Sequence, residues 1–295
     1  LIAACRAKGN AVCAGLDPRW ESLPLAVRGR HEGAPVDRSA VAGAFEEFCS
    51  RALDVLAPLV PVVKPQMAFF EQCGPAGFAA LERLARKAHD LGLLVILDGK
   101  RNDIASTAAA YADAAFEVWD ADALTVNPYL GRDAVEPFLA SARRSGRGVF
   151  VLVRTSNPGA GQFQDLDCGG RPLYLHVAEA VRSWARENVG QCGFGDVGAV
   201  VGATYPAELA LLRQTLPEAM FLVPGFGAQG AGAADTAAAF RPDGLGAVVN
   251  SSRGILFPFR PDDPHWEARI EAAARAAIAA LATATPMSRL ASSSP

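Results

Sequence analysis

Residues 91–104 read LGLLVILDGKRNDI, and this stretch decides the fold. An apolar run that ends abruptly in charged residues is typical of a strand buried on both faces. In an extended chain, residues two apart project from the same face, so Asp98 and Lys100 are expected to point into one space. Asp103 follows after a short turn, close enough to join them or to reach a neighbouring subunit. On its own, the charged segment would also fit a solvated turn.

Similar apolar, β-branched runs recur along the whole chain, separated by Ala-rich helical stretches. The expected strands are residues 11–16, 60–64, 93–98, 123–127, 149–154, 197–202, 220–224 and 247–250. Continuously apolar strands that alternate with helices predict a parallel sheet covered by helices. Eight such units predict an α/β fold, a single (β/α)₈ barrel, with a doubly wound open sheet as the alternative.

Three segments follow the spacing of amphipathic helices, namely residues 41–55, 78–91 and 266–281. Ser39 is a candidate N-cap for the first of these helices, and Pro75 is a candidate first-turn residue for the second. The chain becomes low in complexity from Ala282 on. We therefore expect one barrel domain over residues 1–285 and a disordered tail over residues 286–295.

Composition narrows the class of protein. A formal net charge of −3 over 295 residues, without a basic block, argues against nucleic acid as a partner. No run of about 18 apolar residues is present, so we expect no membrane span. The first ten residues carry charge too early for a secretory signal. The six cysteines lack C-x-x-C spacing and the four histidines lack metal-ligand spacing, which predicts a reduced, cytoplasmic protein without a structural metal.

Polar residues cluster directly after the strands, where barrels place their active sites. Glycines in residues 224–230 and Arg253 follow strands seven and eight, the usual phosphate-binding position. Backbone N–H groups beside Gly227 can approach an anion closely, Arg253 offers a bidentate fork, and Gln229 adds a neutral donor. Asn127 ends the fourth strand at the same mouth and is a further candidate for substrate binding.

Lys64 ends an apolar strand, where an unpaired ammonium group would be costly to bury. Asp98 on the adjacent strand is its expected partner, so Lys64, Asp98, Lys100 and Asp103 are expected to form an alternating charge array. An ammonium group between carboxylates stays protonated, which suits it to act as a positioned cation and proton donor. Two long loops, residues 21–36 and 155–171, are expected to form a surface excursion and a mobile flap over the mouth. The alternative for each loop is an insertion without a catalytic part.

Six motifs in combination closely resemble those of the orotidine 5′-phosphate decarboxylase family, in particular its longer bacterial subgroup. They are residues 15–19, residues 64–66 with 69–71, and residues 98–107, 154–159, 223–230 and 250–254. The resemblance runs from about Gly15 to Gly254 and so covers most of the chain. It departs at Gly99, where the shorter enzymes carry a larger residue. The resemblance implies decarboxylation of orotidine 5′-monophosphate to uridine 5′-monophosphate in pyrimidine synthesis, without a metal or organic cofactor.

The resemblance also implies catalytic roles for the charge array. Lys100 would protonate C6 of the pyrimidine as CO₂ leaves, and Asp98 would lie beside the departing carboxylate. Lys64 would hold Asp98 and a ribose hydroxyl. Asp103 would act in the site of a partner subunit, which makes a homodimer the expected functional unit.

Substrate-binding roles follow in the same way. Asp17 would bind a ribose hydroxyl and Ser156 the amide edge of the pyrimidine. Gln229 and Arg253 would hold the phosphate. Ile104 and Thr107 would join Asp103 in reaching the partner's site.

Two alternatives remain open at this point. A magnesium-dependent sugar-phosphate decarboxylase or aldolase on the same barrel shares the Asp-x-Lys-x-x-Asp motif. Those relatives resemble one another in a metal-binding glutamate at the end of strand two, where this chain has Lys64, a cation that would repel Mg²⁺. A non-catalytic barrel that binds a phosphorylated ligand would need Arg253 and Gln229 but not the lysine–aspartate array.

Overall fold

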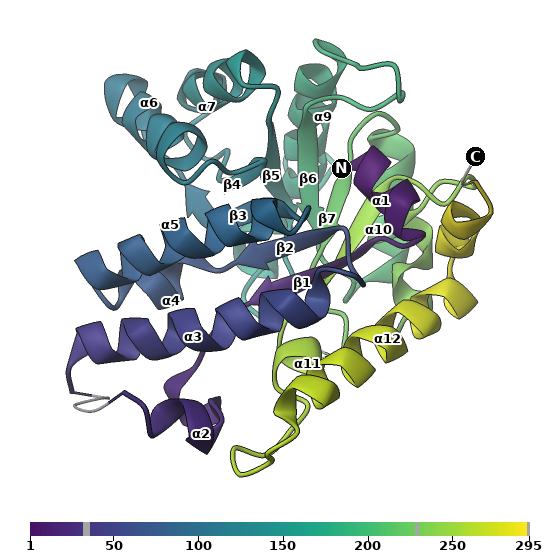
Figure 1. Ribbon diagram of the computed structural model, residues 1–295. Helices are drawn as coiled ribbons and strands as arrows, with labels where there is room; N and C mark the ends of the chain where they lie inside the picture. Colours follow the sequence, from purple (N-terminus) through teal and green to yellow (C-terminus); the bar gives the residue numbers. More distant parts are fainter. Residues whose placement is uncertain (32–35, 228–229, 294–295) are drawn as a thin grey trace.

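Eight parallel strands close into one barrel, which confirms the predicted fold (Figure 1). The computed structural model describes residues 1–31, 36–227 and 230–293. β1 pairs with both β2 and β8, so the sheet closes on itself. The strands are β1 (Val12–Leu16), β2 (Val62–Pro65), β3 (Leu94–Arg101), β4 (Ala123–Val126), β5 (Gly148–Arg154), β6 (Val197–Val201), β7 (Phe221–Val223) and β8 (Ala247–Ser251).

Helices connect the strands and surround the barrel (Figure 1). The α-helices are α1 (Ile2–Lys8), α2 (Leu25–Arg28), α3 (Arg38–Leu56), α4 (Met67–Glu71), α5 (Pro75–Asp90), α6 (Ala105–Asp113), α7 (Arg132–Arg144), α8 (Gly161–Gln164), α9 (Leu173–Arg186), α10 (Pro206–Thr215), α11 (Arg253–Leu256) and α12 (Trp266–Ala284). Short helices of other types are η1 (Trp20–Ser22), η2 (Ala114–Val118), η3 (Ala234–Ala239) and η4 (Pro286–Ser293).

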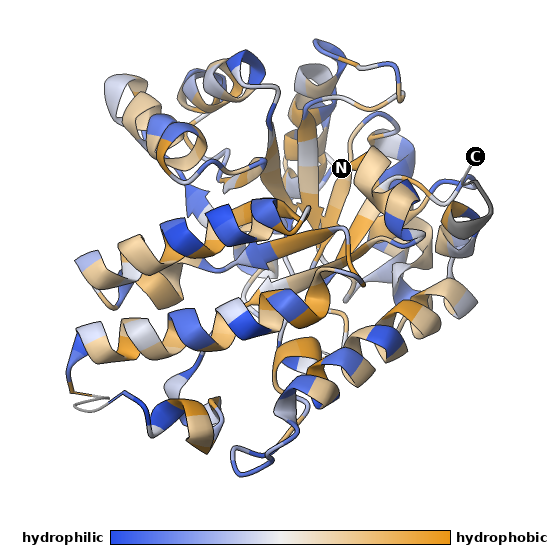
Figure 2. Cartoon of the chain, in the orientation of Figure 1, coloured by the Kyte–Doolittle hydropathy of each residue, from blue (hydrophilic) through white to orange (hydrophobic). Residues whose placement is uncertain are grey.

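The hydropathy of the chain explains this layering. Every residue of β1, β4, β6 and β8 is buried, as expected for parallel strands covered on both faces. Figure 2 shows apolar strands at the centre and most polar residues on the surrounding helices and loops. Pro75 occupies the first turn of α5 as predicted. The predicted cap of α3 is wrong, because Asp37 rather than Ser39 is the N-cap and its carboxylate accepts from the Ser39 N–H at 2.8 Å.

The predicted disordered tail is also corrected by the structure. Pro286–Ser293 form the 3₁₀ helix η4, in which Met287 and Leu290 are buried. Residues three apart lie on the same side of a 3₁₀ helix, so these two apolar side chains pack together against the barrel. The Met287 sulfur accepts a hydrogen bond from the Ala11 N–H beside β1 at 3.2 Å.

The two long loops contain short helices. In the loop after β1, Leu23 directly follows η1 and Val27 lies in α2. Both side chains are buried, so this part of the predicted surface excursion contributes to the core. The loop after β5 contains the short helix α8.

The six cysteines are free thiols, four of them buried. None of the helices in the described ranges combines the length and apolar character needed to cross a bilayer.

Candidate active site

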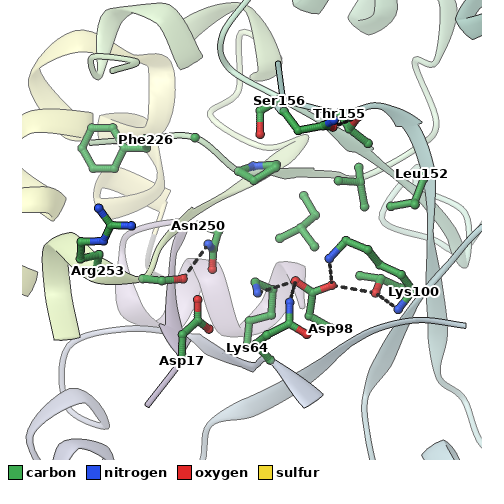
Figure 3. A pocket seen from close by; sticks show the side chains of 18 of the residues that line it. Asp17, Lys64, Asp98, Lys100, Leu152, Thr155, Ser156, Phe226, Asn250 and Arg253 are labelled. Carbon is green, nitrogen blue, oxygen red and sulfur yellow. Dashed lines mark hydrogen bonds and ion pairs between the residues drawn. The ribbon is translucent and has the colours of Figure 1, made fainter. Parts of the chain in front are cut away.

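The carboxyl ends of the strands surround a cavity of about 560 Å³ (Figure 3). Side chains from β2, β3, β4 and β8, together with residues that follow β1, β2, β5 and β8, supply its polar groups. The polar lining residues are Asp17, Arg19, Lys64, Gln66, Asp98, Lys100, Thr125, Thr155, Ser156, Asn157, Gln164, Asn250, Ser252 and Arg253. The structure therefore brings together six of the predicted site residues: Asp17, Lys64, Asp98, Lys100, Ser156 and Arg253.

Asp98 is the centre of the polar network on one side of this cavity (Figure 3). Its Oδ2 accepts from Lys64 Nζ at 2.7 Å and from Gln66 Nε2 at 3.1 Å. Its Oδ1 accepts from Lys100 Nζ at 2.6 Å and from Thr125 Oγ1 at 3.0 Å. Four donors thus fix the carboxylate, and two of them carry positive charge.

This arrangement keeps Asp98 and Lys64 ionised despite their burial. Burial opposes ionisation of Asp98, but the ammonium groups of Lys64 and Lys100 outweigh it and hold the pKa of the carboxyl far below its usual value. Burial likewise opposes the charge on Lys64, but Asp98 and Asp17 raise the pKa of its ammonium group above the usual value. Lys100 differs in being 45% exposed at its side chain, so its ammonium group faces the cavity.

The cavity lining also carries unpaired acceptors. Asp17 Oδ1 and Asn250 Oδ1 are both buried, and neither has a hydrogen-bond partner in the described part of the chain. Asn250 Nδ2 donates to Ser252 Oγ at 3.2 Å, which orients the amide. Buried acceptors normally have partners, so these two oxygens are available to hydroxyl donors of a ligand.

The loops after β7 and β8 contribute glycine and arginine residues at the cavity. Gly225 and Gly227 have φ angles of 103° and 78°, a left-handed conformation that favours glycine. Gly225 and Phe226 line the cavity, whereas Gly227 lies just beyond it. Arg253 is exposed at the cavity rim. The predicted phosphate ligand Gln229 lies outside the described residues.

The start of the flap is held by the side chain of Gln164 in α8. Its Oε1 accepts from the Thr155 N–H at 3.0 Å, and its Nε2 donates to Thr155 Oγ1 at 2.8 Å. Buried Arg154 adds an ion pair to Asp165 at 3.0 Å and a second to Glu208 in α10 at 2.5 Å. These contacts place Ser156 beside the cavity.

Besides Gly227, four predicted residues in the described part of the chain do not line this cavity. Ile104 and Thr107 are exposed around the start of α6. Asp103 Oδ1 accepts from the Ile104 N–H at 2.8 Å, so its carboxylate precedes α6 rather than joining Asp98. Asn127 Oδ1 accepts from the Tyr129 N–H at 3.0 Å and orders the loop after β4. The array predicted from sequence thus contains Lys64, Asp98 and Lys100 within one subunit, but not Asp103.

Three residues that the sequence did not single out for a role contribute to the site. Gln66 and Thr125 bind Asp98, and Gln164 orders the flap. Thr125 is a polar residue within the otherwise apolar strand β4, and this was the signal that the sequence offered for it. The glycine at position 99 also has a structural reason, because a Cβ there would lie 2.7 Å from the sulfur of buried Met67.

Metal ligation has little support in this donor set. In the described part of the chain, no three His, Cys, Asp or Glu side chains form a group that could hold a metal ion. Asp98, a buried carboxylate at the mouth, is already bound by N–H donors on Oδ2 and by an N–H and an O–H donor on Oδ1.

The closed barrel and the polar mouth at its strand ends define a (β/α)₈-barrel enzyme. Residues 10–261 match the model of the orotidine 5′-phosphate decarboxylase / HUMPS family. The chain therefore belongs to this family, and it is an enzyme of the carboxy-lyase class.

Individual relatives agree with this assignment. A protein of Rhodopirellula baltica named orotidine 5′-phosphate decarboxylase is 48% identical over 92% of this chain and 94% of its own length. A protein of the same name from Roseiflexus sp. is 46% identical over 88% of each chain. The solved structure of Leishmania donovani OMP decarboxylase is 36% identical, covers 96% of both chains and superposes with a TM-score of 0.76.

Proposed function

We propose that this enzyme converts orotidine 5′-monophosphate to uridine 5′-monophosphate and CO₂ in pyrimidine synthesis, with Lys100 as the proton donor. The observation that carries the proposal is the pair of ammonium groups held on one buried carboxylate, with Lys100 open to the cavity. The proposed substrate rests on the names of the relatives, and the proposed role of Lys100 rests on the geometry of the site.

The reaction breaks the bond between C6 of the pyrimidine and its carboxylate. The electron pair stays on C6, CO₂ leaves, and a proton from Lys100 Nζ forms the new C6–H bond. This electron pair lies in an sp² orbital without a conjugated acceptor, so a nearby cation lowers the barrier. An ammonium group already fixed by Asp98 provides that charge without reorganisation at the moment of reaction. The neutral lysine then regains a proton from solvent.

The remaining residues bind the substrate away from the reacting carbon. Arg253, Gln229 and the backbone near Gly227 would hold the phosphate. Asp17 would accept from a ribose hydroxyl, consistent with its unpaired Oδ1. Ser156 would bind the amide edge of the pyrimidine. Phosphate binding can close the loops over the site and so increase the rate of a step several bonds away.

We further propose that the functional unit is a homodimer with shared active sites. Asp103 lies outside the cavity of its own subunit, beside exposed Ile104 and Thr107. On the same segment Ile104 and Tyr111 leave 55% and 40% of their surfaces exposed, which suits a face covered by another subunit. Asp103 and Thr107 would then complete the partner's site. No metal or organic cofactor enters the proposed reaction.

The proposed function is tested with purified protein and orotidine 5′-monophosphate. The absorbance of the substrate should fall while uridine 5′-monophosphate and CO₂ form in equal amounts. Activity should persist after treatment with EDTA. A protein that binds the nucleotide without consuming it would be a binding barrel, and loss of turnover in EDTA would favour the magnesium-dependent alternative.

A further inference from the structure

We propose that Thr125 is a positioning residue, whose hydroxyl fixes Lys100 and Asp98 relative to each other. The inference rests on the proposed function, because it concerns the lysine assigned there as proton donor. Thr125 lies in β4, lines the cavity and is only 1% exposed. None of the sequence motifs that indicate the family includes it.

The direction of both hydrogen bonds at this hydroxyl is fixed by chemistry. The Lys100 N–H lies 2.9 Å from Thr125 Oγ1 and can only donate to it. Ionised Asp98 can only accept, and its Oδ1 lies 3.0 Å from the same Oγ1. The hydroxyl proton must therefore point at Asp98. One side chain thus bridges the backbone of Lys100 and the carboxylate that binds its ammonium group.

The backbone of Lys100 needs such support. Its φ angle is 45°, in the left-handed region that residues with a Cβ rarely adopt. The register between β3 and β4 shifts between Leu97 and Arg101, so Lys100 lies within a bulge of the ladder. At this point the Thr125 side chain provides the acceptor for the Lys100 N–H. The hydroxyl is therefore part of what holds the bulge in place.

This position makes Thr125 relevant to the chemical step rather than to nucleotide binding. Lys100 Nζ and Thr125 Oγ1 bind the same oxygen of Asp98, while Lys64 and Gln66 bind the other. Without the hydroxyl, the Lys100 N–H loses its partner and Oδ1 loses a donor, so the ammonium group can move from its place. Small displacements of a catalytic group reduce rate strongly. The residues proposed to bind phosphate and ribose would be unaffected.

The test compares Thr125→Val, which keeps the shape but lacks the hydroxyl, with Thr125→Ser, which keeps the hydroxyl. Thr125→Val should lower kcat by about 10- to 100-fold, with KM and the affinity for uridine 5′-monophosphate within about threefold of wild type. Thr125→Ser should restore kcat to within about fivefold. A crystal structure of Thr125→Val should show an altered Lys100 backbone or a displaced Asp98 carboxylate.

Thr285→Val is the matched control. Thr285 is also buried, donates to the Leu281 carbonyl at 2.8 Å and accepts from the Met287 N–H at 3.1 Å, but it lies outside the cavity. Its substitution should leave kcat unchanged. Thr125→Val with kcat within about threefold of wild type, or Thr125→Ser as impaired as Thr125→Val, would overturn the proposal.

The failure of the proposed decarboxylase activity can be distinguished from the failure of the proposed role of Thr125. If the wild-type protein does not consume orotidine 5′-monophosphate, the proposed function is wrong. The crystal structure of Thr125→Val then decides the positioning role alone, and unchanged Lys100 and Asp98 conformations would contradict it.

Discussion

Lys64 and Lys100 bind opposite oxygens of one carboxylate, with Lys64 Nζ 2.7 Å from Asp98 Oδ2 and Lys100 Nζ 2.6 Å from Asp98 Oδ1. The two lysines differ in burial, because the Lys64 side chain is 5% exposed and that of Lys100 is 45% exposed. Buried Lys64 therefore stabilises the charge of Asp98, whereas the ammonium group of Lys100 can contact a ligand in the cavity.

Removing the ammonium group of Lys64, the buried partner of Asp98, should destabilise the fold. Lys64→Met leaves Asp98 buried beside one cation, and we expect the free energy of unfolding to fall by about 3 kcal/mol in urea denaturation. Lys87→Met is the matched control, because Lys87 also pairs with an aspartate, Asp54, at 2.7 Å, but both side chains are far more exposed. This control should cost less than about 1 kcal/mol. Equal losses for the two variants would contradict a structural role for the buried pair.

Arg253 should discriminate phosphorylated ligands from bare nucleosides. Arg253→Ala is expected to weaken binding of uridine 5′-monophosphate by about 100-fold in calorimetric titration and to leave uridine binding almost unchanged, since only the former carries a phosphate for the guanidinium fork. Arg260→Ala provides the control, because Arg260 has a side chain 88% exposed. A similar loss of affinity for both ligands would assign Arg253 a structural role instead.

His89 should make stability depend on pH. Its hydrogen bond to Asp122, with 3.0 Å between Nε2 and Oδ2, raises the pKa of the imidazole above its usual value. A raised pKa stabilises the fold below the unfolded-state pKa, and this contribution is lost as pH rises through the folded-state pKa. Burial opposes ionisation of Asp122, but its favourable contacts, of which the hydrogen bond from His89 is the largest, outweigh burial and lower the pKa of the Asp122 carboxyl. Asp122 therefore stays ionised over the pH range in which His89 titrates.

The expected result is a melting-temperature difference between wild type and His89→Gln that is larger near pH 5.5 than near pH 8.5, on either side of the usual histidine pKa of about 6.5. His176→Gln is a suitable control, because His176 contacts the Cys168 carbonyl rather than a carboxylate. A difference that is constant across this range would show that the His89–Asp122 contact does not favour the protonated ring.

Mixed subunits test the shared active site. Lys100→Ala and Asp103→Ala should each be inactive alone. If Asp103 acts in the partner's site, a heterodimer contains one site with both defects and one site with neither, so activity should recover toward half per dimer. Subunit exchange is verified by mass spectrometry of the mixture. Confirmed exchange with no recovery would mean that Asp103 acts within its own subunit or not at all.

Much of the barrel could be predicted from sequence because each buried parallel strand leaves a short apolar run. The site residues at strand ends, such as Lys64 and Asp98, were predictable for the same reason, since charge directly after such a run must lie at the mouth. Thr125 was not, because threonine is an ordinary strand former and its role depends on the bulge at Lys100. No apolar pattern encodes that bulge.

Ends of elements were predicted less well than their centres. Asp37 and Ser39 are both good capping residues two positions apart, so the sequence could not choose between them. The helix over residues 286–293 was missed because its large apolar residues are two, Met287 and Leu290, within a Ser-rich segment. The sequence could not choose between the charge array and a partner's site for Asp103, and the structure places its carboxylate at the start of α6, where it accepts from the Ile104 N–H.

The most direct test of the central claim is the rate of orotidine 5′-monophosphate decarboxylation by Lys100→Ala, measured beside wild type and Lys87→Ala. Lys100→Ala should remain folded and lose at least about 1,000-fold in kcat, because the proton donor and the cation nearest the reacting carbon are both absent. Lys87→Ala should match wild type. A folded Lys100→Ala protein with kcat within about tenfold of wild type would contradict the assignment of Lys100 as the proton donor.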